Sequence, residues 1–507
     1  MTTIPAILQE NARRWPERDA LIATNRNGDQ RVSFAELEKA SLQFSGSLAG
    51  KGIKPGDHVL VFVPMSIELY VTLLGLFRLG AVAVFLDPSA GIKHINNCCA
   101  MLPPAALVSV WPLRLLKPFV KGLRRIPQSF APPRMRSTNA NPLLPPLPSA
   151  DDAALITFTS GSTGAPKAAV RTHRFLIAQH RVLQSSIALE SGEQDLTTLP
   201  VFVLANLASG VTSILPDAKI SRPGSVDAKK IARQAARLRP TRTGGSPAFY
   251  QRLATAPEAL ATLRKIYTGG APVFPSLLQH LQTLAPQAEV VAVYGSTEAE
   301  PIAHIACREI TDEDWASMRG GRGLLAGSPV PEVRLRIIKD QWGQKPDSLS
   351  PLDSGQTGEI LVTGDHVLKG YLHGRGDEET KVPLDGEIWH RTGDAGYLDD
   401  HGRLWLMGRC SASIRDQRGV LYPFAVECVA MTYAAIQRAA FVRDGEKRLL
   451  ALELAGQWSA EEMGTLKEQL RWAGVDKIRV LPRIPVDARH NAKVNYPELA
   501  KLLKRQS

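Results

Sequence analysis

The sequence predicts an α/β protein, with a large N-terminal domain of layered α/β subdomains and a small α+β C-terminal domain. Near the N-terminus, apolar strand-like runs alternate with helical stretches, which is typical of a parallel sheet. The alternation resumes at Asp151 and continues to about Gly408, after which the pattern changes. A length of 507 residues, 44% of them hydrophobic, is enough for one large core and a smaller one.

Local signals define the first elements. Ser33 and Glu36 form a capping box that begins a helix, and Gly52 ends it. A buried strand, a second helix and a second buried strand follow, and this order predicts a parallel pair of strands. The expected elements are a helix over 33–48, a strand over 59–63, a helix over 66–79 and a strand over 81–86.

The composition changes between Trp111 and Pro148. This Pro-rich segment has seven Lys and Arg residues and no acidic residue, so it is predicted to be an insertion in the large domain. The apolar residues Leu113, Leu116, Val120 and Leu123 would share one helical face, which Pro118 interrupts. Two interpretations stay open: a solvated basic connection packed on the domain, or a peripheral contact with a membrane surface over residues 111–136.

The C-terminal part forms a separate unit in this prediction. The large domain covers residues 1–408 and the small one covers 409–507, where 17 Lys and Arg against 11 Asp and Glu give +6. Strands are expected near 439–442 and 448–454, and a helix near 460–472. We expect this basic domain to be mobile and to close on an anionic substrate.

Composition also excludes several classes of protein. The net charge of +12 fits an anionic partner, but the chain has no recognisable nucleic-acid-reading motif, so no nucleic-acid partner is expected. The chain contains no Gly-x-Ser-x-Gly, which argues against a serine hydrolase. Five cysteines without a CxxC pair argue against disulfides and structural zinc. No apolar window is long enough to span a bilayer, so a cytoplasmic location is expected.

A polar loop after a buried strand is the most informative motif. Its small, hydroxyl and Gly residues, closed by a lysine, are suited to wrapping a polyphosphate. It fails the Walker A pattern because Pro166 stands where the second Gly is needed. Without other support such a loop is equally typical of a linker. Its residues are Thr159, Ser160, Gly161, Ser162, Thr163, Gly164 and Lys167.

Four further blocks support the phosphate-binding interpretation. A Gly-Gly turn after a strand leaves space for a flat ring, and an aromatic, a hydroxyl and a carboxylate follow one another in the second block. The third block ends in a loop carboxylate suited to ribose hydroxyls, and the fourth places a lysine in a polar loop. The blocks are Gly269-Gly270-Ala271-Pro272, Tyr294-Gly295-Ser296-Thr297-Glu298, Trp389 to Asp394, and Arg489 to Lys493.

In their order and spacing these motifs resemble the core motifs of the adenylate-forming superfamily, which includes acyl-CoA synthetases, nonribosomal adenylation domains and luciferases. Further matches are Gly358-Glu359-Ile360, Lys369-Gly370-Tyr371 and Gly408-Arg409. The resemblance runs from about residue 5 to the C-terminus. It implies an ATP- and Mg²⁺-dependent attack of a carboxylate on the α-phosphorus, which gives an acyl adenylate and pyrophosphate. An acceptor such as coenzyme A then displaces AMP.

The same resemblance implies roles for single residues. The polar loop with Thr159 and Lys167 would hold the β- and γ-phosphates, and Thr297 the α-phosphate. Glu298 would bind Mg²⁺, and Lys493 would neutralise charge at the reacting oxygens. Tyr294 and Gly270 would flank adenine, and Asp394 with Arg409 would hold the ribose.

Departures from the family pattern lie in regions that serve the second half-reaction. Many CoA ligases have His at the position of Val203, Asp or Lys at that of Ser411, and Gly at that of Ala492. The block from Pro200 to Asp217 and the block ending at Lys493 are similar to the β-lactone synthetases of olefin biosynthesis. In those enzymes a β-hydroxyl of the substrate displaces AMP without coenzyme A. Both acceptors, coenzyme A and an internal hydroxyl, stay open.

The acid is expected to be aliphatic. No Asp or Lys is evident that would pair with an amino acid's α-amino group, and a buried unpaired ammonium is costly. A fatty acid or a hydroxy fatty acid fits better. The candidate pocket residues, each of which core packing alone also explains, are Phe202, Leu204, Leu207, Phe249 and Ile302.

Overall fold

The computed structural model describes residues 2–87, 90–134, 145–160, 166–487 and 493–505. The chain divides into two compact units. Unit 1 comprises Met1–Ile220, Lys229–Gly244 and Leu368–Glu378, and unit 2 comprises Ser221–Ala228, Gly245–Val367 and Glu379–Ser507. The predicted boundary after residue 408 falls inside unit 2, near the end of β20 (Leu404–Arg409), and it stays a prediction.

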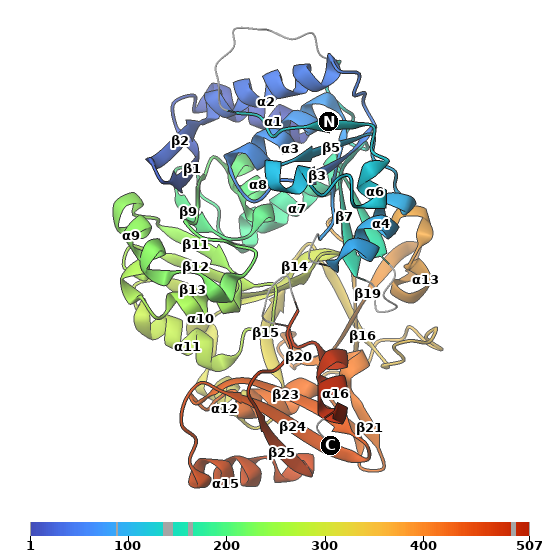
Figure 1. Cartoon of the computed structure of the whole chain (residues 1–507). Coiled ribbons are helices and arrows are strands. Elements are labelled where there is room, and N and C mark those ends of the chain that lie inside the picture. The colour runs from blue at the N-terminus through green and yellow to red at the C-terminus, as the bar shows by residue number, and fades with distance from the viewer. Residues whose placement is uncertain (1, 88–89, 135–144, 161–165, 488–492, 506–507) are drawn as a thin grey trace. The chain divides into compact units, whose positions relative to one another are not determined.

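The first sheet of unit 1 is mostly parallel, as the alternation of strands and helices predicted (Figure 1). Its spatial order is β6 (Gln128–Phe130), β5 (Ala106–Ser109), β3 (His58–Phe62), β4 (Val82–Phe85), β7 (Ala153–Ser160) and β8 (Pro166–Thr172). Neighbouring strands run parallel, with His58 opposite Val82, except that β8 returns antiparallel to β7. The antiparallel return brings Lys167 opposite Thr159, across the predicted phosphate loop.

Successive residues of β3 enter two different cores, so both faces of this sheet are covered. Val59 and Val61 belong to a cluster with residues of α1, α2, α3, α7 and α8, whereas Leu60 and Phe62 join one with residues of α4 and α6. The capping box of Ser33 and Glu36 is confirmed at the start of α2. The helices are α1 (Ile4–Arg14), α2 (Phe34–Ala49), α3 (Ile67–Leu79), α4 (Ile92–Met101), α5 (Trp111–Arg114), α6 (Lys121–Arg124), α7 (His173–Ser186), α8 (Pro200–Ser209) and α9 (Ala228–Leu238).

A second set of strands in unit 1 has the order β2 (Gly28–Ser33), β1 (Asp19–Asn25), β10 (Thr212–Leu215), β9 (Gln194–Thr197) and β11 (Arg242–Gly245). A buried polar network ties it together. The Arg242 guanidinium, almost fully buried, pairs with Glu193 at 2.6 Å, and Asn206 on α8 donates to Asp195 at 2.8 Å. This network fixes α8 against the strands.

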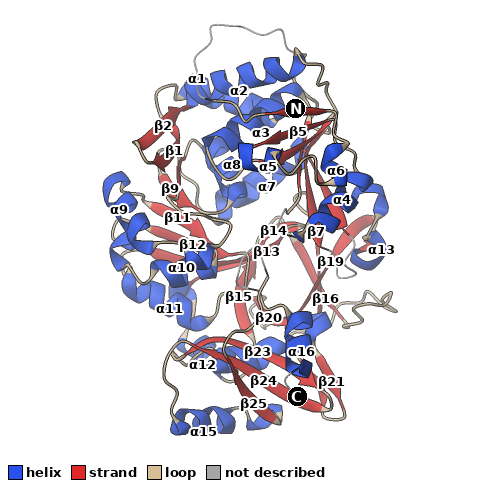
Figure 2. Ribbon diagram, in the orientation of Figure 1, coloured by secondary structure: helices blue, strands red, loops and turns tan. Residues whose placement is uncertain are grey.

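The large sheet of unit 2 combines parallel and antiparallel strands (Figure 2). Its order is β12 (Lys265–Gly269), β13 (Glu289–Ser296), β14 (Ala299–Ala306), β15 (Leu324–Pro329), β20, β19 (Glu387–Leu398), β17 (Gly358–Thr363) and β16 (Arg334–Ile338), with β18 (Lys381–Leu384) beside β19. The helices α10 (Pro247–Leu253), α11 (Pro275–Leu284) and α12 (Asp312–Arg319) accompany it, and α13 (Asp377–Thr380) precedes β18. Only β12 and β13 run parallel among the pairs given for this sheet.

The last hundred residues form a smaller α+β assembly. The three-stranded sheet β23 (Ile436–Asp444), β24 (Lys447–Leu454) and β25 (Lys477–Leu481) is covered on both faces. Phe441 packs with residues of α14 and α15, whereas Val442 packs with residues of α16. The remaining elements are the hairpin β21 (Ile414–Asp416) and β22 (Gly419–Leu421), and the helices α14 (Pro423–Ala430), α15 (Ala460–Gln469) and α16 (Tyr496–Arg505).

The Pro-rich segment differs from the sequence prediction. Instead of one amphipathic helix it contains two four-residue helices, α5 and α6, on either side of Pro118. Val120 and Leu123 are buried, so the predicted common face does not exist. No helix in the described part of the chain is long and apolar enough to cross a membrane. All five cysteines are buried and unpaired.

Candidate functional site

The predicted phosphate-binding loop, residues 159–167, lies in unit 1. Gly161, Ser162, Thr163 and Gly164 lie outside the described residues, as do the side chains of Thr159 and Ser160. Lys167 is described: its side chain is buried, with Nζ 5.8 Å from the centroid of the Tyr371 ring. A bridge pairs Ala169 with Tyr371, so the predicted Lys369-Gly370-Tyr371 motif lies beside Lys167.

The backbone at Gly376 makes room for this lysine. Gly376 has φ +102°, and a Cβ placed there would lie 2.5 Å from Cδ of Lys167. Lys167 is therefore held between the Tyr371 ring and the backbone of Gly376. Its ammonium is a compact positive charge. This placement fits the predicted role of a cation for a polyanion.

Unit 2 contains a cavity of about 1,200 Å³, including its open mouth. The cavity brings together predicted residues that lie more than 200 positions apart in the sequence. Those lining it are Gly270, Ala271, Pro272, Tyr294, Gly295, Ser296, Asp394, Arg409 and Lys493. Three neighbours in the motifs, Gly269, Thr297 and Glu298, are not among the lining residues.

The Gly-Gly turn at the end of β12 leaves no space for side chains. A Cβ at Gly269 would lie 2.6 Å from the carbonyl oxygen of Val293 on the neighbouring strand, and Gly270 has φ +78°. Backbone therefore forms this wall of the cavity. That a flat ring approaches this backbone closely stays a prediction.

A carboxylate on β19 is the centre of the polar wall. The Tyr294 hydroxyl donates to Oδ2 of Asp394 at 2.8 Å, and Nε of Arg409 lies 3.2 Å from Oδ1. Burial and the Asp394 carboxylate raise the pKa of Tyr294, while that carboxylate raises the pKa of Arg409. An ionised carboxylate accepts hydrogen bonds only, which suits vicinal hydroxyls as donors.

The prediction that Asp394 lies in a loop was wrong. Asp394 lies inside β19, where Gly393 has φ +70° and the ladder to β20 is irregular between Ala395 and Gly396. The sequence signal of a turn came from this distortion, because a positive-φ glycine marks a bulge as well as a turn. The strand then pairs Asp394 directly with Arg409.

Glu298, the predicted metal ligand, lies on the turn between β13 and β14. Its backbone N–H donates to Oγ of Ser296 at 3.2 Å, and its charge acts on His390 and Arg409. Burial, together with the nearby Lys381 ammonium, lowers the pKa of His390 to about 3. Among the described residues no three His, Cys, Asp or Glu side chains gather as a metal cage. A single carboxylate such as Glu298 is nevertheless what Mg²⁺ needs when phosphates supply its other ligands.

Lys493 directly follows residues 488–492, and its backbone is paired with Asp487. Its backbone N–H donates to Oδ1 of Asp487 at 2.9 Å, and the N–H of Asp487 donates to the Lys493 carbonyl at 2.8 Å. The bridge between Val486 and Val494 extends this pairing. Residues 488–492 of the loop lie outside the described part of the chain. The paired stem therefore fixes the backbone of Lys493 at the cavity wall.

Several lining residues of the cavity were not predicted, among them Phe274, Phe424, Glu427 and Tyr496. Glu427 is almost fully buried, and its Oε1 accepts hydrogen bonds from the Phe441 N–H at 2.9 Å and the Tyr496 hydroxyl at 2.8 Å. Burial raises the pKa of the Glu427 carboxyl to about 7. The signal was a lone carboxylate within the apolar helix α14, together with a tyrosine three residues after Lys493.

Glu427 predicts a pH dependence of stability. The buried carboxyl keeps its proton from about pH 4.5, the ordinary pKa, up to about pH 7, so stability falls as the pH rises through this window. The free energy of unfolding falls by roughly 3 kcal/mol across this window. Glu427→Gln, which cannot ionise, is expected to remove this slope in urea unfolding between pH 5 and 8. An equal slope in both proteins would contradict the assignment, and Glu446→Gln, at an exposed position, serves as the control.

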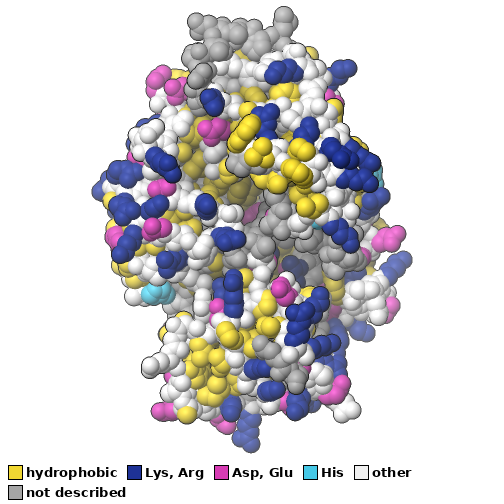
Figure 3. Space-filling model, in the orientation of Figure 1, with side chains coloured by type: hydrophobic (Ala, Val, Ile, Leu, Met, Phe, Trp, Pro, Cys, Tyr) yellow, Lys and Arg dark blue, Asp and Glu magenta, His cyan; other side chains and the backbone are white. Residues whose placement is uncertain are grey.

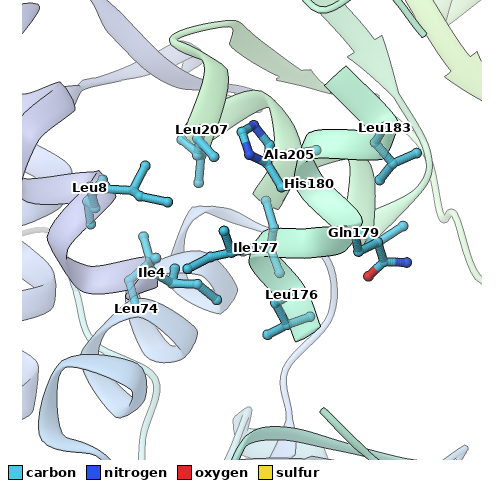
Figure 4. A pocket seen from close by; sticks show the side chains of 14 residues that line it. Ile4, Leu8, Leu74, Leu176, Ile177, Gln179, His180, Leu183, Ala205 and Leu207 are labelled. Carbon is cyan, nitrogen blue, oxygen red and sulfur yellow. The ribbon is translucent and has the colours of Figure 1, made fainter. Parts of the chain in front are cut away.

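The predicted apolar pocket is only partly assembled. Leu204 and Leu207 line a crevice of about 560 Å³, mouth included, between α1, α3, α7 and α8 of unit 1. Figure 4 shows Leu8, Ile4 and Leu74 facing Ile177, His180 and Leu207 across it. Of the other predicted residues, Phe202 packs against the backbone of Gly244, whereas Phe249 and Ile302 are buried in unit 2.

The crevice has two polar side chains, His180 and Gln179. Nε2 of His180 lies 2.9 Å from Oγ of Ser209, and burial lowers the pKa of His180 to about 4. The imidazole is therefore neutral at physiological pH. The remaining wall is aliphatic, so it suits an alkyl group rather than a charged one.

Comparison with known proteins identifies the family of this chain. The family model described as "AMP-binding enzyme" matches residues 8–372. An olefin β-lactone synthetase of Stenotrophomonas maltophilia is 32% identical over 98% of this chain and 97% of that protein. The olefin β-lactone synthetase of Xanthomonas campestris pv. campestris is 30% identical over 99% of this chain and 98% of that protein.

Among solved structures, O-succinylbenzoate coenzyme A synthetase from Bacillus subtilis in complex with ATP and magnesium has the same fold. The TM-score is 0.80 at 23% identity, over 98% of this chain and 99% of that one. The family motifs predicted from the sequence, the fold and the match over most of the chain agree. The chain belongs to the family of AMP-binding enzymes.

Proposed function

We propose that this protein uses ATP and Mg²⁺ to activate a carboxylic acid as an acyl adenylate, with release of pyrophosphate. One observation carries the proposal: Tyr294, Asp394, Arg409 and Lys493 line a single cavity together with the turn of Gly270, Ala271 and Pro272. That turn suits a base, and the Asp394 carboxylate suits ribose hydroxyls.

Each charged residue has a task in this reaction. The carboxylate oxygen attacks the α-phosphorus while the bond to the pyrophosphate oxygen breaks, so negative charges must come together. The Lys493 ammonium would stabilise the charge that develops on the α-phosphate. Lys167 and the polar loop of unit 1 would hold the β- and γ-phosphates. Glu298 would hold Mg²⁺, which supplies charge neutralisation when bound.

We propose an aliphatic acid, a fatty or 3-hydroxy fatty acid, as the substrate. The aliphatic crevice with Leu204 and Leu207 offers a surface for an alkyl chain. Two relatives that span nearly the whole chain are both named olefin β-lactone synthetases.

For the acceptor we propose the substrate's own hydroxyl. Its oxygen attacks the acyl carbon, the bond from that carbon to the AMP oxygen breaks, and the hydroxyl proton is released. The products are a β-lactone and AMP. Val203, Ser411 and Ala492, where CoA ligases commonly differ, support this choice. Transfer to coenzyme A is the second candidate, favoured by a 28% identical feruloyl-CoA synthase that aligns with 84% of this chain.

The decisive experiment incubates the protein with ATP, Mg²⁺ and acids of about 8 to 18 carbons, with and without a 3-hydroxyl and with and without coenzyme A. Pyrophosphate release is expected with the longer acids, and loss of water from the 3-hydroxy acid is expected by mass without coenzyme A. A thioester that needs coenzyme A would instead establish the ligase. No pyrophosphate with any of these acids would refute the proposed substrate class.

A further inference from the structure

The segment from α5 to α6 exposes large apolar side chains. Phe119 is 82% exposed, Trp111 70%, Leu115 55% and Leu116 46%. They are four of the nine exposed large hydrophobic side chains in the described part of the chain, and they include the two most exposed ones. Contiguous apolar surface of this kind marks an interaction site. We call Trp111, Leu115, Leu116 and Phe119 the apolar patch.

The exposure does not come from a loosely packed segment. Val120, Leu123 and Ile126 are buried in the core beneath α4, and the Gly122 N–H donates to Oδ1 of Asn96 at 2.7 Å. Lys117 donates to Oγ of Ser129 at 2.8 Å. The alternate apolar residues thus anchor the segment inward, while those of the apolar patch are directed to solvent.

Positive charge surrounds the apolar patch. Residues 88–150 contain eight Lys and Arg and no Asp or Glu. Lys121, Arg124 and Arg125 on and after α6 are exposed, and none pairs with a carboxylate of the described chain. Figure 3 shows Lys and Arg side chains next to hydrophobic ones over this region. The apolar patch therefore lies in a segment whose charged side chains are all cationic, and we call Lys121, Arg124 and Arg125 its cationic border.

We propose that the apolar patch and its cationic border dock this protein on an anionic lipid bilayer. Exposed Trp and Phe insert at the headgroup level of a bilayer, and neighbouring Lys and Arg are attracted by anionic lipids. Trp, Phe and Arg also suit a protein interface, but eight Lys and Arg without one Asp or Glu over residues 88–150 favour a uniformly anionic surface. The inference is independent of the acid that the enzyme activates.

The test is co-sedimentation of the full chain with phosphatidylcholine vesicles, with and without phosphatidylglycerol. Binding is expected with the anionic vesicles and is expected to weaken at high salt. Trp111→Ser/Phe119→Ser is expected to lower the partition coefficient at least about tenfold. Lys121→Gln/Arg124→Gln/Arg125→Gln is expected to abolish the preference for phosphatidylglycerol.

Trp472→Ser is the matched control, since Trp472 is half-exposed but lies in the C-terminal part of unit 2. It is expected to bind vesicles like the wild type, and all variants should retain the wild-type thermal midpoint. The proposal is wrong if the wild type binds neither vesicle or if Trp472→Ser lowers binding as much as the double variant. Self-association without vesicle binding, lost in the double variant, would also overturn it and assign the patch to a protein interface.

Discussion

Lys493→Ala is expected to lower acid-dependent pyrophosphate release by at least about a hundredfold. The reason is electrostatic: a carboxylate must approach a polyphosphate, and the cavity wall of unit 2 supplies Lys493 and Arg409 as its cations. Arg409 already faces the Asp394 carboxylate, so it cannot replace the missing ammonium. The measurement is the initial rate of pyrophosphate release with saturating ATP, Mg²⁺ and acid.

The control for this variant is Lys501→Ala. Lys501 is exposed on α16, eight residues further along the same part of the chain, and it does not line the cavity. Its rate should equal that of the wild type, and both variants should unfold at the wild-type temperature. A rate for Lys493→Ala within about threefold of the wild type would mean that the ammonium does not act on the developing charge.

Glu359→Leu is expected to lower the free energy of unfolding by roughly 3 to 5 kcal/mol. Glu359 on β17 accepts two hydrogen bonds from Arg391 on β19, at 2.9 and 2.6 Å, and both side chains are almost fully buried. Burial raises the pKa of Glu359, although the hydrogen bonds from Arg391 lower it. Without the carboxylate, a guanidinium that cannot lose its proton would stay buried and uncompensated.

A double variant distinguishes the destabilisation caused by an unpaired buried Arg391 from the stabilisation contributed by the ion pair itself. Glu359→Leu/Arg391→Met removes both charges and is expected to be more stable than Glu359→Leu alone. The exposed pair of Glu468 and Arg471 provides the comparison, and Glu468→Ala should change stability by less than about 0.5 kcal/mol. Urea unfolding measures all three. A double variant as unstable as the single one would show that packing, not charge, dominates.

Elements with local signals were predictable. The helix after Ser33, the strands at residues 59–63 and 81–86, and the parallel pairing between them are confirmed within a few residues. Capping boxes and hydrophobic periods depend on residues within a few positions of one another, so they survive in any tertiary context. The segment with Pro118 shows the limit, because a common helical face needs an unbroken helix and the ring of proline prevents one.

The residues of the site were predictable as types but not as an assembly. The motifs containing Tyr294, Asp394 and Lys493 identified the chemistry, because each carries a rare combination of glycine, hydroxyl and charge. Glu427 and Tyr496 escaped, because the hydrogen bond between them joins positions 69 residues apart. Leu204 lines a crevice of unit 1 whereas Phe249 and Ile302 are buried in unit 2, so their grouping in one pocket stays a prediction. Apolar residues of a core and of a pocket look alike in sequence.

The sequence by itself determined the family, the order of the strands and helices, and the charged groups available for catalysis. The tertiary structure decided which of these groups share a cavity, that Asp394 lies on a strand opposite Arg409, and which apolar side chains near Pro118 face solvent. The physical reason is the separation along the chain of the residues that interact. Caps and periodicities are fixed by neighbours in the chain, whereas strand register, burial and the pKa values that follow from it depend on segments that meet only when the chain folds.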